Sequence, residues 1–85
     1  MQRKGQKAIV ENIRLDRGLT AKELKDWFLD QLADRFIPAV TLVNIDVETF
    51  APHNSVVVDL EDFDMFERFK QIDGAICLGM AIRVR

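Results

Sequence analysis

The sequence predicts an α+β fold in which one four-stranded antiparallel sheet carries two helices on one of its faces. Two segments of the 85-residue chain have apolar residues at three- and four-residue spacing, the period of an amphipathic helix. Other segments are short and rich in valine and isoleucine, as strands are. The segments follow one another in the order strand, helix, strand, strand, helix, strand, which is the split β-α-β arrangement.

The chain is long enough for one hydrophobic core and no more, so we expect a single domain. This domain is expected at residues 7–85, after a basic N-terminal extension at residues 1–6. The first strand is expected at residues 7–13, KAIVENI, where apolar and polar residues alternate weakly.

The first helix is marked by a start signal, an apolar face and a stop signal. Thr20 and Glu23 have the spacing of a capping box, in which a hydroxyl and a carboxylate satisfy the first backbone N–H groups. The apolar face that follows consists of Leu24, Phe28 and Leu32. We expect the helix to run to about Arg35, because Pro38 stops it.

Two strands are expected to follow as an antiparallel hairpin. Within residues 40–50, Val43, Ile45 and Val47 alternate with polar residues, which predicts a strand with one solvent-exposed side. Residues 51–54, APHN, have the composition of a turn. Residues 55–60 then predict the partner strand.

The second helix is expected to begin at Asp62 as its N-cap and to end at Asp73-Gly74. Its apolar face is expected to include Phe63, Phe66 and Phe69. A short loop through Gly79 leads to a last strand at residues 80–84. Helices on one face of such a sheet give a ferredoxin-like β-α-β-β-α-β sandwich, whose other face is open to solvent.

The charges are unevenly distributed along the chain, although the net charge is only −2. Lys and Arg are concentrated near the N-terminus, whereas residues 37–66 contain neither. A domain built for tight phosphate binding is usually basic overall, so this balance argues against that function.

The residues of catalytic and metal chemistry are too sparse to form a site. His53 is the only histidine and Cys77 the only cysteine, so a zinc site, a Cys-His nucleophile or an internal disulfide would lack partners. We interpret Cys77 as a small core residue. We therefore expect no enzyme, no cofactor, no metal and no small-molecule substrate. No apolar run approaches the roughly 18 residues that span a bilayer, so no membrane partner is expected.

The strands resemble those of the RNA recognition motif (RRM) family, and the resemblance covers essentially the whole chain. In that family the first strand reads aliphatic, aromatic, aliphatic, any, Asn, aliphatic. Residues 8–13 keep Asn12-Ile13 but have Ile9 at the aromatic position. Residues 53–60, HNSVVVDL, align with the signature of the third strand, with Ser55 and Val57 at the two exposed aromatic positions.

The C-terminal part carries the best match. Residues 72–84, IDGAICLGMAIRV, are similar to the family's "DG-x-x-x-x-G-x-x-L-x-V" ending, and most similar to an RRM of the large-subunit splicing factor that recognises polypyrimidine tracts. The resemblance implies a nuclear protein of pre-mRNA processing, with single-stranded RNA and other RNA-processing proteins as partners.

The open face of the sheet is where an RRM binds RNA, by stacking bases on aromatic side chains. Each such contact contributes about 1–3 kcal/mol, so three aliphatic or small replacements remove roughly 3–9 kcal/mol. The carboxylates Glu11, Asp46 and Asp59, expected on this face, repel phosphates. We therefore expect weak RNA binding there. The candidate RNA contacts are Lys7, Ile9, Asn44, Ser55, Val57, Arg83 and Arg85.

Two alternatives to RNA binding stay open. In the first, the domain binds a protein partner through exposed apolar residues or its helices, with Trp27, Leu42, Asp62, Asp64 and Glu67 as candidate contacts. In the second, it only positions a neighbouring domain of a longer protein. RRMs that capture tryptophan-bearing peptides carry Arg-x-Phe after the second helix, and the segment Gly74–Gly79 lacks it, so this family-specific mode of peptide capture is not expected.

Overall fold

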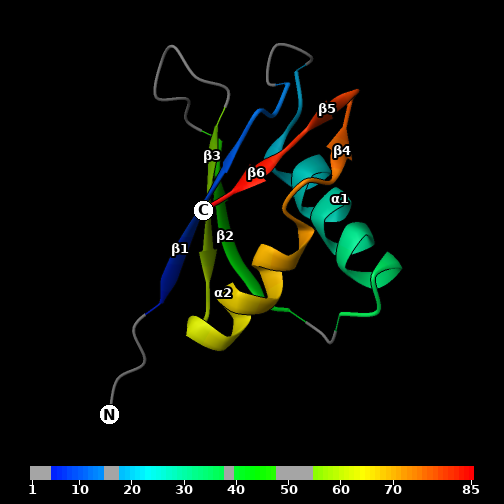
Figure 1. Ribbon diagram of the computed structural model, residues 1–85. Coiled ribbons are helices and arrows are strands. Elements are labelled where there is room, and N and C mark those ends of the chain that lie inside the picture. The colour runs from blue at the N-terminus through cyan, green and yellow to red at the C-terminus, as the bar shows by residue number, and fades with distance from the viewer. Residues whose placement is uncertain (1–4, 15–17, 38–39, 48–54) are drawn as a thin grey trace.

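The structure is a computed structural model that describes residues 5–14, 18–37, 40–47 and 55–85. Its elements lie along the chain in the order shown in Figure 1: β1 (Gln6–Glu11), α1 (Ala21–Asp34), β2 (Leu42–Asp46), β3 (Val56–Leu60), α2 (Phe63–Phe69), the 3-10 helix η2 (Lys70–Ile72), β4 (Ile76–Cys77), β5 (Met80–Ala81) and β6 (Arg83–Val84). The turn expected at residues 51–54, with His53, lies outside the described residues, as does most of the N-terminal extension.

The main sheet has four antiparallel strands in the order β2-β3-β1-β6. The remaining strands, β4 and β5, pair only with each other among the described strands. Alternate residues of β1 and β3 are buried, so one face of the sheet carries the core. The α+β class, with two α-helices and a four-stranded antiparallel sheet, is confirmed, and it is compatible with a ferredoxin-like fold.

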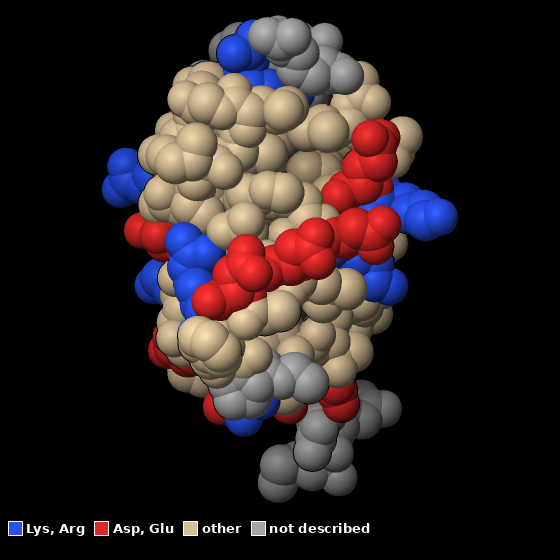
Figure 2. Space-filling model, turned by 90° about the vertical axis from the view of Figure 1, so that its right-hand side faces the viewer, with Lys and Arg blue, Asp and Glu red and all other residues tan. Residues whose placement is uncertain are grey.

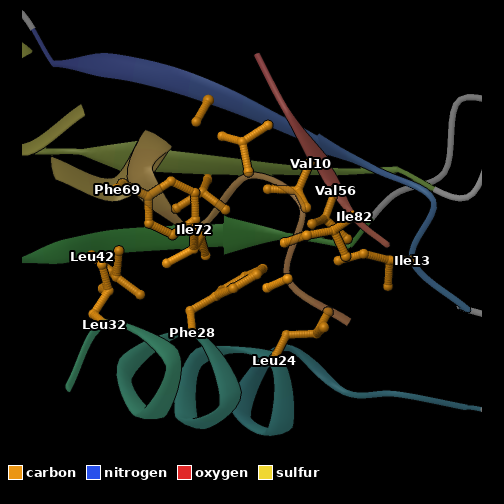
Figure 3. Close-up of a cluster of buried hydrophobic side chains, with 14 of the residues drawn as sticks. Val10, Ile13, Leu24, Phe28, Leu32, Leu42, Val56, Phe69, Ile72 and Ile82 are labelled. Atoms are coloured by element: carbon orange, nitrogen blue, oxygen red, sulfur yellow. The ribbon is translucent and has the colours of Figure 1, made fainter. Parts of the chain in front are cut away.

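The core lies between this face of the sheet and the two helices (Figure 3). Phe28 of α1 meets Phe69 of α2 edge to face, with ring centroids 5.2 Å apart. Burying a side chain of this size stabilises the fold by about 1.5–3 kcal/mol. Around this pair lie Val10, Ile13, Leu24, Leu32, Leu42, Val56, Ile72 and Ile82.

The ends of α1 follow two standard capping patterns. The capping box is confirmed: the Glu23 N–H donates to the Thr20 hydroxyl, and the Thr20 N–H donates to the Glu23 carboxylate. At the other end the N–H of Phe36 donates to the Ala33 carbonyl and that of Ile37 to the Leu32 carbonyl. This is a Schellman ending, and it holds Phe36 at a φ of 57°.

Leu42 was expected to be an exposed contact for a protein partner, and that prediction is wrong. The register of β2 against β3 shifts between Leu42 and Asn44, which marks a β-bulge. The extra residue turns Leu42 into the core, where it is 7% exposed, and leaves Val43 63% exposed. A bulge depends on the partner strand, so the alternation within residues 40–50 did not reveal it.

The last strand was expected as one piece over residues 80–84, and the structure divides it. β4 and β5 form a small hairpin joined by Leu78 and Gly79, with φ of 50° and 84°. Positive φ at both residues is typical of a type I′ turn. Ile82 then pairs with the loop before β4. Its N–H donates to the Ala75 carbonyl, and its carbonyl accepts from the Gly74 N–H. Of residues 80–84, only Arg83 and Val84, which form β6, join the main sheet beside β1.

The first strand is shorter than expected. β1 ends at Glu11, because Asn12 has a φ of 65° and leaves the extended conformation. Ile13 is nevertheless fully buried in the core. The second helix begins as expected, with the Met65 N–H donating to the Asp62 carboxylate, and continues through η2 to Ile72.

Candidate interaction surfaces

The open face of the sheet gathers most of the candidate RNA contacts. The strand register places Val57 of β3 beside Ile9 of β1, and Arg85 exchanges two backbone hydrogen bonds with Ile9. A neighbouring row joins Asn44, Asp59 and Lys7. Residues directly opposite each other in antiparallel strands share a face. The same rule places Arg83 beside Glu11.

Two cations of this face form ion pairs with carboxylates. The Nζ of Lys7 is 3.6 Å from the Oδ1 of Asp59, and the Nε of Arg85 contacts the Oε1 of Glu11. Such exposed pairs contribute only about 0.2–1 kcal/mol to stability. They do, however, lower the positive potential that a phosphate would meet on this face.

Ser55 was expected to be exposed on the open face, and the structure shows it only 8% exposed. It lies immediately before β3, which has a neighbouring strand on each side. A hydroxymethyl group in the middle of a sheet is short enough to be covered by larger side chains around it. Ser55 is therefore a poor candidate for contact with a base edge.

The described strands contain no aromatic residue, so their open face offers no ring on which a base could stack. Ile9 is exposed and Val57 is half-buried, which leaves a narrow apolar strip between charged rows. This arrangement can support contacts with phosphates or apolar groups, but not stacking.

A second surface lies between α1 and the β4–β5 hairpin. It is a groove of about 210 Å³, lined by Leu19, Glu23, Leu24, Trp27, Cys77 and Leu78, and we call it the hairpin groove. Trp27 is half-buried and packs its ring edge to face against Phe28, with centroids 5.5 Å apart. Leu78, at the tip of the hairpin, is 51% exposed. The groove therefore combines a supported aromatic wall with an exposed aliphatic one.

An acidic row runs along the solvent-exposed side of α1 beside this groove. Its members follow one another at three- and four-residue spacing and are all exposed: Glu23, Asp26, Asp30 and Asp34. Residues at this spacing lie along one line of a helix surface. Figure 2 shows the side of the molecule that carries α1, where acidic side chains form a band across a largely uncharged surface.

The candidate protein contacts do not form one surface. Trp27 lies in the hairpin groove, Leu42 lies in the core, and Asp62 and Asp64 begin α2 at the end of the molecule opposite the hairpin (Figure 1). Asp62 caps the helix, and Asp64 pairs with Arg68 at 2.9 Å. Local helix contacts therefore account for these two acids. Glu67 is exposed on the same helix.

Sequence reasoning missed the hairpin side of the groove. The segment Gly74–Gly79 was treated as a loop, although Leu78-Gly79 between Ile76-Cys77 and Met80-Ala81 could have signalled a two-residue hairpin turn. It missed the acidic row as well, although its helical spacing is visible in the sequence. Cys77 is buried at the floor of the groove, and desolvation raises the pKa of its thiol.

Within the described residues, no group of three or more His, Cys, Asp or Glu side chains could hold a metal ion. No helix in the described part of the chain is long and apolar enough to cross a membrane. The chain matches no protein-family model, and no curated protein matches it.

Proposed function

We propose that the chain is an RRM-like domain of ferredoxin-like topology that binds a protein partner in an RNA-processing complex. The four strands of the main sheet are the first, second, third and last strands of the chain. In the sheet they lie side by side in the order second, third, first, last, and this order supports the β-α-β-β-α-β arrangement. The residue pattern of residues 8–13 and 72–84 supports the family. The observation that carries the function is the hairpin groove.

The conformation of Leu78 supports a binding role for this groove. A non-glycine residue in the left-handed region costs about 1–2 kcal/mol, and asparagine or glycine is the usual choice in a type I′ turn. Leu78 has a φ of 50° and leaves half of its surface in water. Strained conformations of this kind cluster at functional sites. An exposed leucine at such a position is well suited to contact a partner.

The charges beside the groove indicate the chemistry of the partner. Its rim carries Glu23, and Asp26 and Asp30 continue the acidic row along α1. The groove has room for one large apolar side chain. We therefore expect a peptide segment with one aliphatic or aromatic anchor flanked by Lys or Arg, because its cations complement the row.

The experiment is an amide-shift titration of the labelled domain with a synthetic peptide that has one tryptophan between arginines. We expect the peptide to shift the amide signals of Trp27 and Leu78. These shifts are expected to be lost in Leu78→Asn and kept in the control Ile76→Asn, which changes another exposed apolar side chain of the hairpin. The same peptide with glutamates in place of arginines is expected to bind at least about tenfold more weakly. Equal binding of both peptides, or shifts confined to the sheet, would contradict the proposal.

Weak binding of single-stranded RNA on the open face is the second candidate. It is favoured by the register, which brings Ile9, Val57 and Arg85 into one row and Lys7 and Asn44 into the next. In a titration with uridine-rich RNA, Asp59→Asn is expected to strengthen binding and steepen its salt dependence, because it releases Lys7 for a phosphate. An unchanged affinity in this variant would argue against RNA on this face.

A further inference from the structure

The two edges of the main sheet differ in how they are closed. At the β6 edge the backbone groups of Arg85 are bonded to Ile9 of β1, so the N–H of the preceding residue, Val84, points away from the sheet. That N–H donates to the Asp73 carboxylate at 2.8 Å. The carboxylate therefore occupies the position where an added strand would accept a hydrogen bond.

At the opposite edge, no described strand pairs with the outer side of β2. β2 is the outer strand of the sheet and pairs only with β3. After the bulge, Asn44, Ile45 and Asp46 pair regularly with β3, which leaves alternate backbone groups directed outward. Val43 is a large exposed apolar side chain at the start of this stretch.

A cleft of about 320 Å³ runs between the β2 edge and α1. Its walls are residues 42–45 of β2 and Ala21, Lys22 and Lys25 of α1, so both of its charged residues are cations and no carboxylate lines it. Lys22 and Lys25 are exposed and lie one turn apart, and this places both ammonium groups on the side of the helix that faces the strand.

We propose that the β2 edge accepts an extended acidic segment of a partner protein as a fifth strand of the sheet. Backbone hydrogen bonds to β2 hold the segment, an apolar side chain covers Val43, and its carboxylates face Lys22 and Lys25. This site is separate from the hairpin groove, which lies on the other side of α1's N-terminal half and favours a basic peptide.

The same charges decide against a second copy of this chain as the occupant. Two β2 edges brought together antiparallel would also bring together the lysines beside each edge, and like charges at close range repel. Lysines and bulges are common protection against edge-to-edge association. The same lysines favour an acidic segment over a second copy of the chain, because the carboxylates of the segment carry the opposite charge.

The test uses the full chain and a synthetic peptide in which valine alternates with glutamate. We expect amide shifts and new exchange protection at residues 42–46. A peptide N-methylated at alternate amides keeps its charge but cannot pair as a strand, and it is expected not to bind. Lys22→Glu/Lys25→Glu, at exposed helix positions, is expected to lower the affinity at least about tenfold.

Lys70→Glu, a charge reversal at an exposed position of η2, serves as the matched control and is expected to bind as the unmodified chain does. Leu78→Asn is expected to leave this binding unchanged, which separates the edge site from the hairpin groove. Equal binding of the N-methylated peptide, shifts located at β6, or dimerisation through β2 without peptide would each overturn the proposal.

Discussion

Phe36 ends α1 in a conformation that phenylalanine rarely adopts. Its φ is 57° and its side chain is 93% exposed, so it carries the left-handed strain without burying its ring in return. We expect Phe36→Gly to raise the free energy of unfolding by about 0.5–1 kcal/mol. Glycine removes the backbone strain, and this gain exceeds the cost of the extra conformational entropy that glycine gives to the unfolded chain. Urea denaturation measures this change.

Phe36→Ala is the control for this prediction. Alanine removes the exposed ring but keeps the Cβ that causes the strain, so the variant is expected to match the unmodified chain. An equal gain in both variants would mean that exposure of the ring, and not the backbone conformation, limits stability at this position.

Cys77 makes the stability of the fold depend on pH in the alkaline range. Burial raises the pKa of its thiol, whereas the unfolded chain releases this proton from about pH 8.5. Above this pH the folded state binds more protons than the unfolded state. The contribution of the Cys77 thiol to stability is therefore fully present below that pH and is lost as the pH rises toward the pKa of the folded state. Denaturation at pH 7 and pH 9.5 is expected to show this loss, and Cys77→Ala is expected to reduce it. An identical loss in Cys77→Ala would assign it to other groups.

Single residues were predictable from the sequence where their partners are near in the chain. The caps at Thr20 and Asp62 bond to groups three residues away, and both are confirmed. Leu42 was placed on the wrong face, and Ser55 was expected to be more exposed than it is. A bulge and coverage by neighbouring strands explain these two errors, and both depend on residues distant in sequence.

The β4–β5 hairpin is the element that was not predicted from the sequence, and its turn places Leu78 in the left-handed region. Leu78→Asn loses some apolar contact but places a residue that tolerates a φ of 50°, whereas Leu78→Ala loses the contact and keeps the strain. We expect the Asn variant to be more stable than the Ala variant by about 0.5–1 kcal/mol. Thermal denaturation of the pair checks this, and the reverse order would show that the turn is not strained.

The longer elements were easier to predict than the hairpin. α1 has an apolar face of Leu24, Phe28 and Leu32 repeated over several turns, and β3 has three consecutive valines. β4 and β5 have only two residues each, too few for a period to be recognised.

At the scale of the whole molecule, the sequence predicted the class and the face of the sheet that carries the core. The segment order and the apolar sides of the segments sufficed to predict a four-stranded antiparallel sheet with two helices. The pairing of residues far apart in the chain, such as Gln6 with Leu60, was not predicted. The hairpin groove could not be predicted in the same way. It requires Trp27 of α1 and Leu78 of the hairpin to meet, and neither segment signals the other.

We propose that the main partner of this domain binds in the hairpin groove and not on the open face of the sheet. One experiment compares amide shifts of the labelled chain with uridine-rich RNA and with the arginine-flanked tryptophan peptide at the same salt concentration. We predict that the peptide shifts Trp27 and Leu78 at the lower concentration, while RNA shifts Ile9 and Val57 weakly. RNA binding at the sheet that is tighter than peptide binding at the groove would contradict the claim.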